Sequence, residues 1–301
     1  MTPRRAHDPQ FDLFIPFITD LPLRDQRETM ERPFFSLSKK KRLKPIDYRS
    51  PDGSVWVRVE AVPSYGMATI WDADILIWAA SVLTDLKKRR ANDIPRTLHF
   101  QPYDLLRAIH RSPGGREYEL LRGSLRRLQS STISTNIRAH SNRKKRQFSW
   151  IDSWTEITSE DGTNVRGMSL TISDWLYEGI LMEGGILAID PDYFSIKGGR
   201  ERWLYRVSRK HAGGHDGVGF AISLPTLFDK AGAEGTYRRF KHEIKRITDR
   251  NNLPEFFLLW EEREGRTEPD LRMIRRSNLT TDHPGYELPV PRTRKAELSR
   301  S

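Results

Sequence analysis

Two stretches of the chain carry pairs of cationic side chains spaced four residues apart. Arg122 and Arg126 form the first pair, and Lys241 and Lys245 form the second. Residues four apart in a helix lie on one face, so each pair would offer two positive charges to one partner. Guanidinium groups bind oxyanions through two parallel hydrogen bonds, and ammonium groups act as point charges. The chemistry that these residues favour is therefore the binding of a negatively charged partner.

The two stretches are copies of one pattern. Tyr118 to Leu128 has the form Tyr-x-x-Leu-Arg-x-x-Leu-Arg-Arg-Leu, and Tyr237 to Ile247 has the form Tyr-x-x-Phe-Lys-x-x-Ile-Lys-Arg-Ile. Both place apolar residues at i, i+3, i+7 and i+10, the spacing that lines one face of a helix. Taken alone, such a helix is most often only a solvated surface helix. Its repetition, together with its surroundings, favours a binding element.

The segments around each copy repeat as well. A short β-like run, a small helix and a glycine-rich turn come before it, and two β-rich runs separated by a polar tip come after it. For the first copy these are 97–100, 103–110, 112–115 and the pair 131–137 with 146–157; for the second they are 219–222, 225–230, 232–235 and the pair 255–260 with 271–275. Helix, strand, helix, helix, hairpin is the order of a winged helix, whose third helix can enter a DNA groove.

The sequence therefore predicts an α+β fold with two tandem winged-helix domains. Residues 1–50 are expected to form an extended N-terminal arm, 51–192 the first domain, 193–276 the second domain and 277–301 a flexible tail. Prolines interrupt the apolar part of the arm, which argues against a long helix there. The run Lys39 to Lys44 could be a nucleic-acid patch or a nuclear address. Solvated charge is the favoured interpretation of that run.

Composition limits the class of partner. The 301 residues include 51 Lys and Arg against 40 Asp and Glu, which gives a formal charge of +11 and a pI of about 9.9. This balance favours a polyanion, although it does not separate nucleic acid from an anionic membrane. The absence of Cys excludes a disulfide framework and fits a reducing cytosol. No apolar run approaches the ~20 residues that span a bilayer, so a cytoplasmic, membrane-free location is expected.

Enzymatic chemistry finds little support in the sequence. There is no P-loop and no His-x-His pair, and His211 and His215 are separated by Gly213-Gly214, which argues for a turn rather than a helical metal site. A metal-dependent nickase could use Tyr103, Tyr118 or Tyr237 as its nucleophile. Tyr118 and Tyr237 begin the apolar stripes, however, so core packing is favoured. No catalytic residue, metal or cofactor is expected.

Several phrases of the sequence resemble the replication initiator protein A family of bacterial plasmids. They are Arg24 to Gln26, Met30 to Leu37, Tyr65 to Asp72 and the two repeated helices, and the resemblance covers most of residues 10 to 276. It implies binding to repeated sites (iterons) on double-stranded origin DNA, opening of an AT-rich segment and recruitment of the host initiator ATPase and helicase. It also implies monomers on the repeats, a homodimer in copy control, and association with the plasmid or nucleoid. The rival hypothesis is a winged-helix transcriptional regulator without a replication role.

The expected DNA-binding residues fall into three groups. They are Arg116, Arg122, Arg126 and Arg127 of the first helix; Arg143, Lys144, Lys145 and Arg146 of the polar tip; and Arg238, Arg239, Lys241, His242, Lys245, Arg246 and Arg250 of the second helix. Residues 236–250 contain six Lys or Arg and two acids, a net +4, whereas residues 116–130 have a net +2. The second helix is therefore predicted to make the stronger groove contact, and the first to add backbone contacts or a protein interface.

Overall fold

The structure is a computed structural model that describes residues 21–91, 93–139, 145–158, 165–214, 217–262, 264–265, 267–283 and 285–286. Within these ranges the helices are α1 (Ala73–Lys88), α2 (Pro102–Ala108), α3 (Gly115–Ser130), α4 (Asp174–Leu181), α5 (Gly199–Ala212), α6 (Leu224–Ala231) and α7 (Tyr237–Arg250). The strands are β1 (Arg24–Gln26), β2 (Ile46–Arg49), β3 (Trp56–Glu60), β4 (Thr97–Phe100), β5 (Thr132–Thr135), β6 (Arg146–Phe148), β7 (Ile151–Thr158), β8 (Val165–Ile172), β9 (Ile186–Ala188), β10 (Phe220–Ser223), β11 (Phe256–Glu261) and β12 (Asp270–Arg275). Short 3-10 turns cover Arg27–Thr29, Pro191–Ser195 and Arg276–Asn278.

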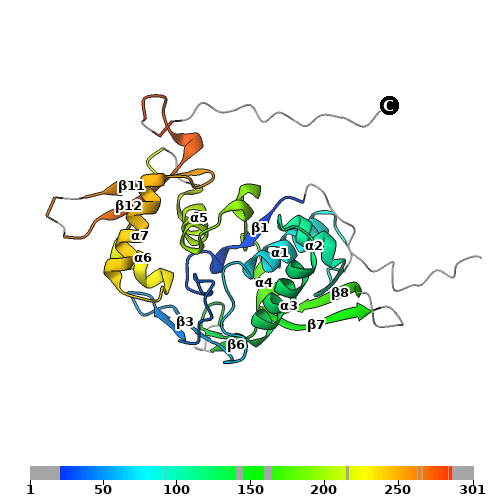
Figure 1. The fold of residues 1–301 in the computed structure, drawn as a ribbon. Helices are drawn as coiled ribbons and strands as arrows, with labels where there is room; N and C mark the ends of the chain where they lie inside the picture. Colours follow the sequence, from blue (N-terminus) through cyan, green and yellow to red (C-terminus); the bar gives the residue numbers. More distant parts are fainter. Residues whose placement is uncertain are drawn as a thin grey trace, which may run out of the picture.

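The second repeat has the order of elements that the sequence predicts. Helix α5 is followed by β10, α6, α7 and the antiparallel hairpin of β11 and β12, and the sheet order is β10-β12-β11. In Figure 1 these elements lie together at one end of the molecule, with the β11–β12 hairpin projecting outward beside α7. Strand β10 completes the sheet by pairing with β12, and α6 packs against β10 while α7 packs against β11 of the hairpin.

The first repeat differs from the prediction in its strands. Residues 131–137 and 146–157 were expected to form one hairpin, and this holds only for β5 and β6, because 151–157 pairs elsewhere. Strand β5 pairs with β3 and β6 in the sheet β2-β3-β5-β6, whereas β7 pairs with β8 in the sheet β4-β8-β7. The reason is Trp150, which is buried between β6 and β7 and donates its backbone N–H to the carbonyl of Leu128 instead of joining a ladder. The chain leaves one sheet there and enters the other.

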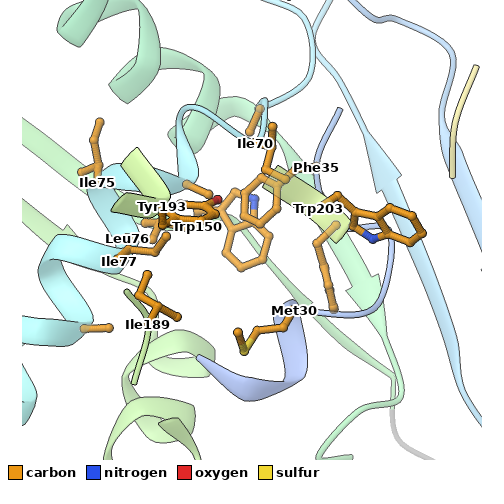
Figure 2. Packing of buried hydrophobic residues seen from close by; sticks show 14 of the residues in the cluster. Met30, Phe35, Ile70, Ile75, Leu76, Ile77, Trp150, Ile189, Tyr193 and Trp203 are labelled. Carbon is orange, nitrogen blue, oxygen red and sulfur yellow. The ribbon is translucent and has the colours of Figure 1, made fainter. Parts of the chain in front are cut away.

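Residues assigned to the N-terminal arm contribute to the core. Met30, Phe34 and Phe35 are buried, and β1 pairs with β9. The rings of Phe35 and Trp150 are stacked with centroids 4.7 Å apart, and Figure 2 shows both among buried residues of the core that include Met30 and Tyr193. Burial of aromatic rings of this size is a major source of stability in a domain. The described part of the arm is therefore an integral part of the fold.

Helix α5 joins the two repeats through buried ion pairs. Arg206 donates two hydrogen bonds to Asp25, at 2.7 and 3.1 Å, and Arg202 donates one to Asp74 of α1 at 2.6 Å. In Figure 1 α5 lies between α7 on one side and β1 and α1 on the other. Desolvated charges are tolerated only when they are paired and hydrogen-bonded. The buried arginines of α5 therefore connect this helix to the segments that carry their aspartate partners.

Candidate nucleic-acid interface

Helix α7 has the buried and exposed faces that its sequence predicts. Phe240, Ile244 and Ile247 are buried, and the Thr236 hydroxyl caps the first turn by accepting a hydrogen bond from the Arg239 N–H. The helix ends at Arg250, because the next residue, Asn251, has a left-handed φ of 47° that stops the helical path. The cap, the apolar stripe and the C-terminal stop fix which side of α7 faces solvent.

Three cationic or titratable side chains form a row on the solvent side of α7. Arg238, His242 and Arg246 are exposed and follow one another at intervals of four residues. None of them has an ion-pair partner within the part of the chain that the structure describes. At 1.5 Å of rise per residue the row is about 12 Å long. It offers hydrogen-bond donors that no carboxylate of the described chain occupies.

The other cations of α7 are held in ion pairs at the surface. They are Arg239 with Glu243 at 2.9 Å, Lys245 with Asp249 at 2.9 Å, Arg250 with Glu201 at 2.7 Å and Lys241 with Glu268 at 2.8 Å. Exposed pairs of this kind are worth little, about 0–1 kcal/mol, so an incoming phosphate can replace the carboxylate. These four side chains therefore surround the unpaired row with cations that can exchange a carboxylate for a phosphate.

Glu268 ties the β11–β12 hairpin to α7. It accepts hydrogen bonds from the Tyr237 hydroxyl and from Lys241. Burial and the bond to Glu268 raise the pKa of Tyr237, so the phenol stays a neutral donor. Lys245 also lies 5.4 Å above the ring of Trp260 on β11. The hairpin is thus oriented against the helix that carries the unpaired row.

Helix α3 uses part of its charge for the fold. Leu121, Leu125 and Leu128 are buried as predicted. Arg127 donates to both oxygens of buried Asp72, at 2.7 and 2.8 Å, at the start of α1. Arg122 is engaged by Glu119 and Glu156. Only two of the four cations predicted on α3 are exposed without such partners in the described residues, namely Arg116 and Arg126.

The polar tip after β5 is described in part. Arg143 and Lys144 lie outside the described residues. Lys145 is exposed, and Arg146 begins β6 and donates to Glu178 of α4 at 3.1 Å. Because β6 pairs with β5, this tip belongs to the sheet β2-β3-β5-β6 and not to the β7–β8 hairpin that follows α3 in space. The predicted site is therefore spread over three surfaces.

Comparison with known proteins identifies the family. Residues 24–258 match the profile of the family described as Replication initiator protein A. The chain belongs to the replication initiator protein A family. It is 34% identical over 236 residues to the "Putative replication protein" of Wigglesworthia glossinidia brevipalpis, an alignment that covers 77% of this chain and 83% of that relative. The resemblance inferred from the sequence is confirmed.

The fold of this initiator-family chain resembles a solved structure. A crystal structure of domains 2 and 3 of RctB matches with a TM-score of 0.55 and 14% sequence identity, covering 81% of this chain and 96% of that one. At such low identity the match concerns the fold alone. It shows that the arrangement of helices and sheets described above occurs in another protein of known structure.

The described ranges of this family member hold neither a metal site nor a membrane span. No group of His, Cys, Asp or Glu there could hold a metal ion, and no helix there is long and apolar enough to cross a bilayer. His211 lies at the end of α5 and hydrogen-bonds to Glu31 at 2.7 Å, and His215 lies outside the described residues. His211 is therefore engaged by a carboxylate of the fold.

A second cationic surface was not anticipated as a site. The run Lys39 to Lys44 was interpreted as solvated charge, but Arg42 is buried and donates to the Gly232 carbonyl at 2.6 Å. Lys39, Lys40 and Lys41 line a cavity of about 610 Å³ together with residues of three other segments. No sequence pattern connects segments so far apart, so only the charge run itself could have indicated this surface.

Proposed function

We propose that this chain initiates plasmid replication by binding repeated duplex sites at the origin, with α7 in the major groove. Opening of an AT-rich segment and recruitment of host replication proteins follow from the same proposal. Membership of the replication initiator protein A family supports the replication role. The observation that carries the DNA contact is the exposed, unpaired row Arg238, His242 and Arg246 on α7.

The proposed architecture is two winged helices in tandem, over residues 51–192 and 193–276. The order α5, β10, α6, α7, β11, β12 supports this for the second unit, and α1, β4, α2, α3, β7, β8 supports it for the first. In such a unit the third helix enters the groove and the hairpin contacts the flanking backbone. By this assignment α7 and α3 are the two groove helices, and the hairpins β11–β12 and β7–β8 are the wings.

The geometry of α7 suits a groove contact. The row of about 12 Å is comparable with the width of the major groove of B-DNA, about 12 Å. Arg238 and Arg246 can each form two hydrogen bonds with a guanine edge, and the paired cations around them can exchange their carboxylates for phosphates. Helix α3 takes the weaker role, since Arg122 and Arg127 are committed to carboxylates and only Arg116 and Arg126 are available. The tip residues Arg143, Lys144, Lys145 and Arg146 are proposed as backbone contacts.

The test is duplex binding by the full chain with DNA that flanks its gene. Footprinting should give evenly spaced protection, and Arg238→Ala with Arg246→Ala should weaken binding by about 1–3 kcal/mol for each guanine that is no longer bound. Lys241→Ala with Lys245→Ala should weaken all duplexes and reduce the salt slope by about 0.9 for each phosphate that is no longer neutralised. Arg49→Ala, an exposed arginine on β2, is the matched control.

The replication role needs its own measurement. A plasmid that carries this gene with its flanking repeats should replicate, and the Arg238→Ala, Arg246→Ala variant should abolish replication while the Arg49→Ala variant does not. A chain that binds the repeats but supports no replication would be a regulator, which is the rival hypothesis. Unchanged affinity and salt slope in both α7 variants would remove α7 from the interface.

A further inference from the structure

A cavity of about 610 Å³ opens beside the first turn of α3, away from the row on α7. Its walls come from four segments of the chain: 39–41, 65–72, 111–127 and 194–202. Small-molecule sites in proteins typically have volumes of about 300–1,000 Å³. The cavity is therefore large enough for one nucleotide-sized ligand and too small for a duplex.

Five cations at this cavity have no carboxylate partner among the residues that the structure describes. They are Lys39, Lys40, Lys41, Arg116 and Lys197. Lys41 donates to the Ser64 carbonyl at 3.1 Å, and Lys39 lies 5.0 Å from the ring centroid of Trp71, so two of them are positioned by neutral groups. Neutral partners leave the full positive charge available to a ligand.

The carboxylates of the cavity are too few to balance this charge. Asp72 is neutralised by the two hydrogen bonds from Arg127, which leaves Glu117 as the other carboxylate on the described lining. Arg111 and Arg202 also line the cavity, and both pair with Asp74 behind it. The floor is thus a closed ion-pair network, and the unpaired cations are gathered above it.

Apolar side chains stand among these cations. Tyr65 is 46% exposed and Leu120 is 45% exposed, and both line the cavity with Trp71. Aromatic rings beside a cationic surface are the arrangement by which proteins stack single nucleic-acid bases. Because Lys39 already covers Trp71, the exposed aromatic ring in the lining that can receive a base is that of Tyr65.

We propose that this cavity binds a nucleoside phosphate, with the base stacked on Tyr65 and the phosphate held by Lys40, Lys41 and Lys197. The ligand can be a free nucleotide or an unpaired nucleotide of single-stranded DNA, since both present the same ring and the same phosphate. The site lies on different elements from α7 and does not depend on the proposed duplex contact.

Fluorescence anisotropy of the full chain tests this assignment. The probes are a labelled oligothymidylate of about ten nucleotides, within the usual range of single-strand site sizes, a labelled dATP and a labelled duplex. Tyr65→Ala should raise the dissociation constant of the strand or of dATP by about fivefold or more, as expected for the loss of one stacked base. Lys40→Ala with Lys197→Ala should lower the salt slope for the strand by about 0.7 for each phosphate that the variant no longer neutralises.

Matched controls separate the effect of the cavity residues from the effect of removing any exposed tyrosine or any two positive charges. Tyr103 on α2 is 48% exposed and does not line the cavity, so Tyr103→Ala controls for Tyr65→Ala. Lys44 and Lys88 are exposed lysines outside the cavity, so their double alanine variant controls for the loss of two charges. Duplex affinity should stay the same in the Tyr65 variant, which keeps this result distinct from the test of α7.

Each outcome of these binding measurements either supports the proposed nucleotide site or overturns it. Loss of strand affinity without dATP binding assigns the cavity to single-stranded DNA, and loss of both assigns it to a nucleotide in either form. The proposal is overturned if neither probe binds, or if the control variants lose as much affinity as the cavity variants. It is also overturned if Tyr65→Ala leaves the affinity for both probes unchanged, because no base would then stack on this ring. Displacement of the probes by inorganic pyrophosphate in that case would mean that the cavity holds a bare anion.

Discussion

Glu31 is a buried carboxylate that joins the N-terminal segment to the second repeat. It hydrogen-bonds with Lys210 and His211 of α5 and with Lys230 of α6. Burial alone would raise the pKa of this carboxyl, but the bonds to His211, Lys210 and Lys230 outweigh it and hold the pKa below its usual range. Glu31 therefore stabilises the fold only while it is ionised.

Replacing Glu31 by Gln tests this linkage. At neutral pH the free energy of unfolding should fall by about 3–5 kcal/mol, because Lys210 and Lys230 lose their buried counter-charge. The pKa of Glu31 is lower in the folded chain than the unfolded value of about 4.3. The contribution of the carboxylate is therefore complete above about pH 5 and is lost as the pH falls, so the gap between parent and variant should narrow below about pH 4. Urea unfolding at several pH values measures this.

Glu60→Gln is the control for that series. Glu60 is exposed on β3 and pairs with Arg58 at the surface, where an ion pair adds little. Its replacement should change stability by less than about 0.5 kcal/mol at any pH. Equal losses in the two variants, or a Glu31 gap that does not depend on pH, would contradict the assignment.

At the scale of elements, the repeated helices follow from periodicity alone. The i, i+3, i+7, i+10 spacing fixes which side of α3 and α7 is buried, and it requires no knowledge of the neighbours. The strands after α3 could not be predicted in the same way. Their pairing depends on Trp150 being buried and bonded to the backbone of Leu128, a contact that no local pattern encodes.

Truncation of the buried leucine and isoleucine of the repeats tests the helix faces. Leu125 and Ile244 are fully buried at equivalent positions of α3 and α7. Leu125→Ala and Ile244→Ala should each lower the free energy of unfolding by about 2–5 kcal/mol, because methyl groups and their packing are removed from a filled core. Urea unfolding followed by tryptophan fluorescence gives the values.

Leu120 provides the comparison on the same helix. It is 45% exposed on α3, so Leu120→Ala should cost no more than about 0.5 kcal/mol. A larger loss for Leu120 than for Leu125 would mean that the buried side of α3 is assigned to the wrong residues. Circular dichroism confirms that each variant keeps its helices before stabilities are compared.

At the scale of the molecule, charge has two separate uses. Lys and Arg were expected to lie at the surface, and Arg238 and Arg246 of α7 are exposed. The burial of Arg202 and Arg206 could not be predicted from the sequence. Their partners Asp74 and Asp25 lie 128 and 181 residues away in the chain. A buried arginine is identified by its partner, and the partner is known only from the fold.

These buried pairs predict that the two repeats unfold together. The hydrophobic core is one cluster with members from both repeats, and Arg206 joins α5 to Asp25 across it. Urea unfolding should therefore give coincident transitions when it is followed by hydrogen exchange at α3 and at α7. Asp25→Asn leaves Arg206 buried without its counter-charge and should cost about 3–5 kcal/mol, with α7 exchanging before α3. Asp47→Asn, an exposed aspartate on β2, should change neither. Separate transitions in the parent chain would mean that α5 does not couple the repeats.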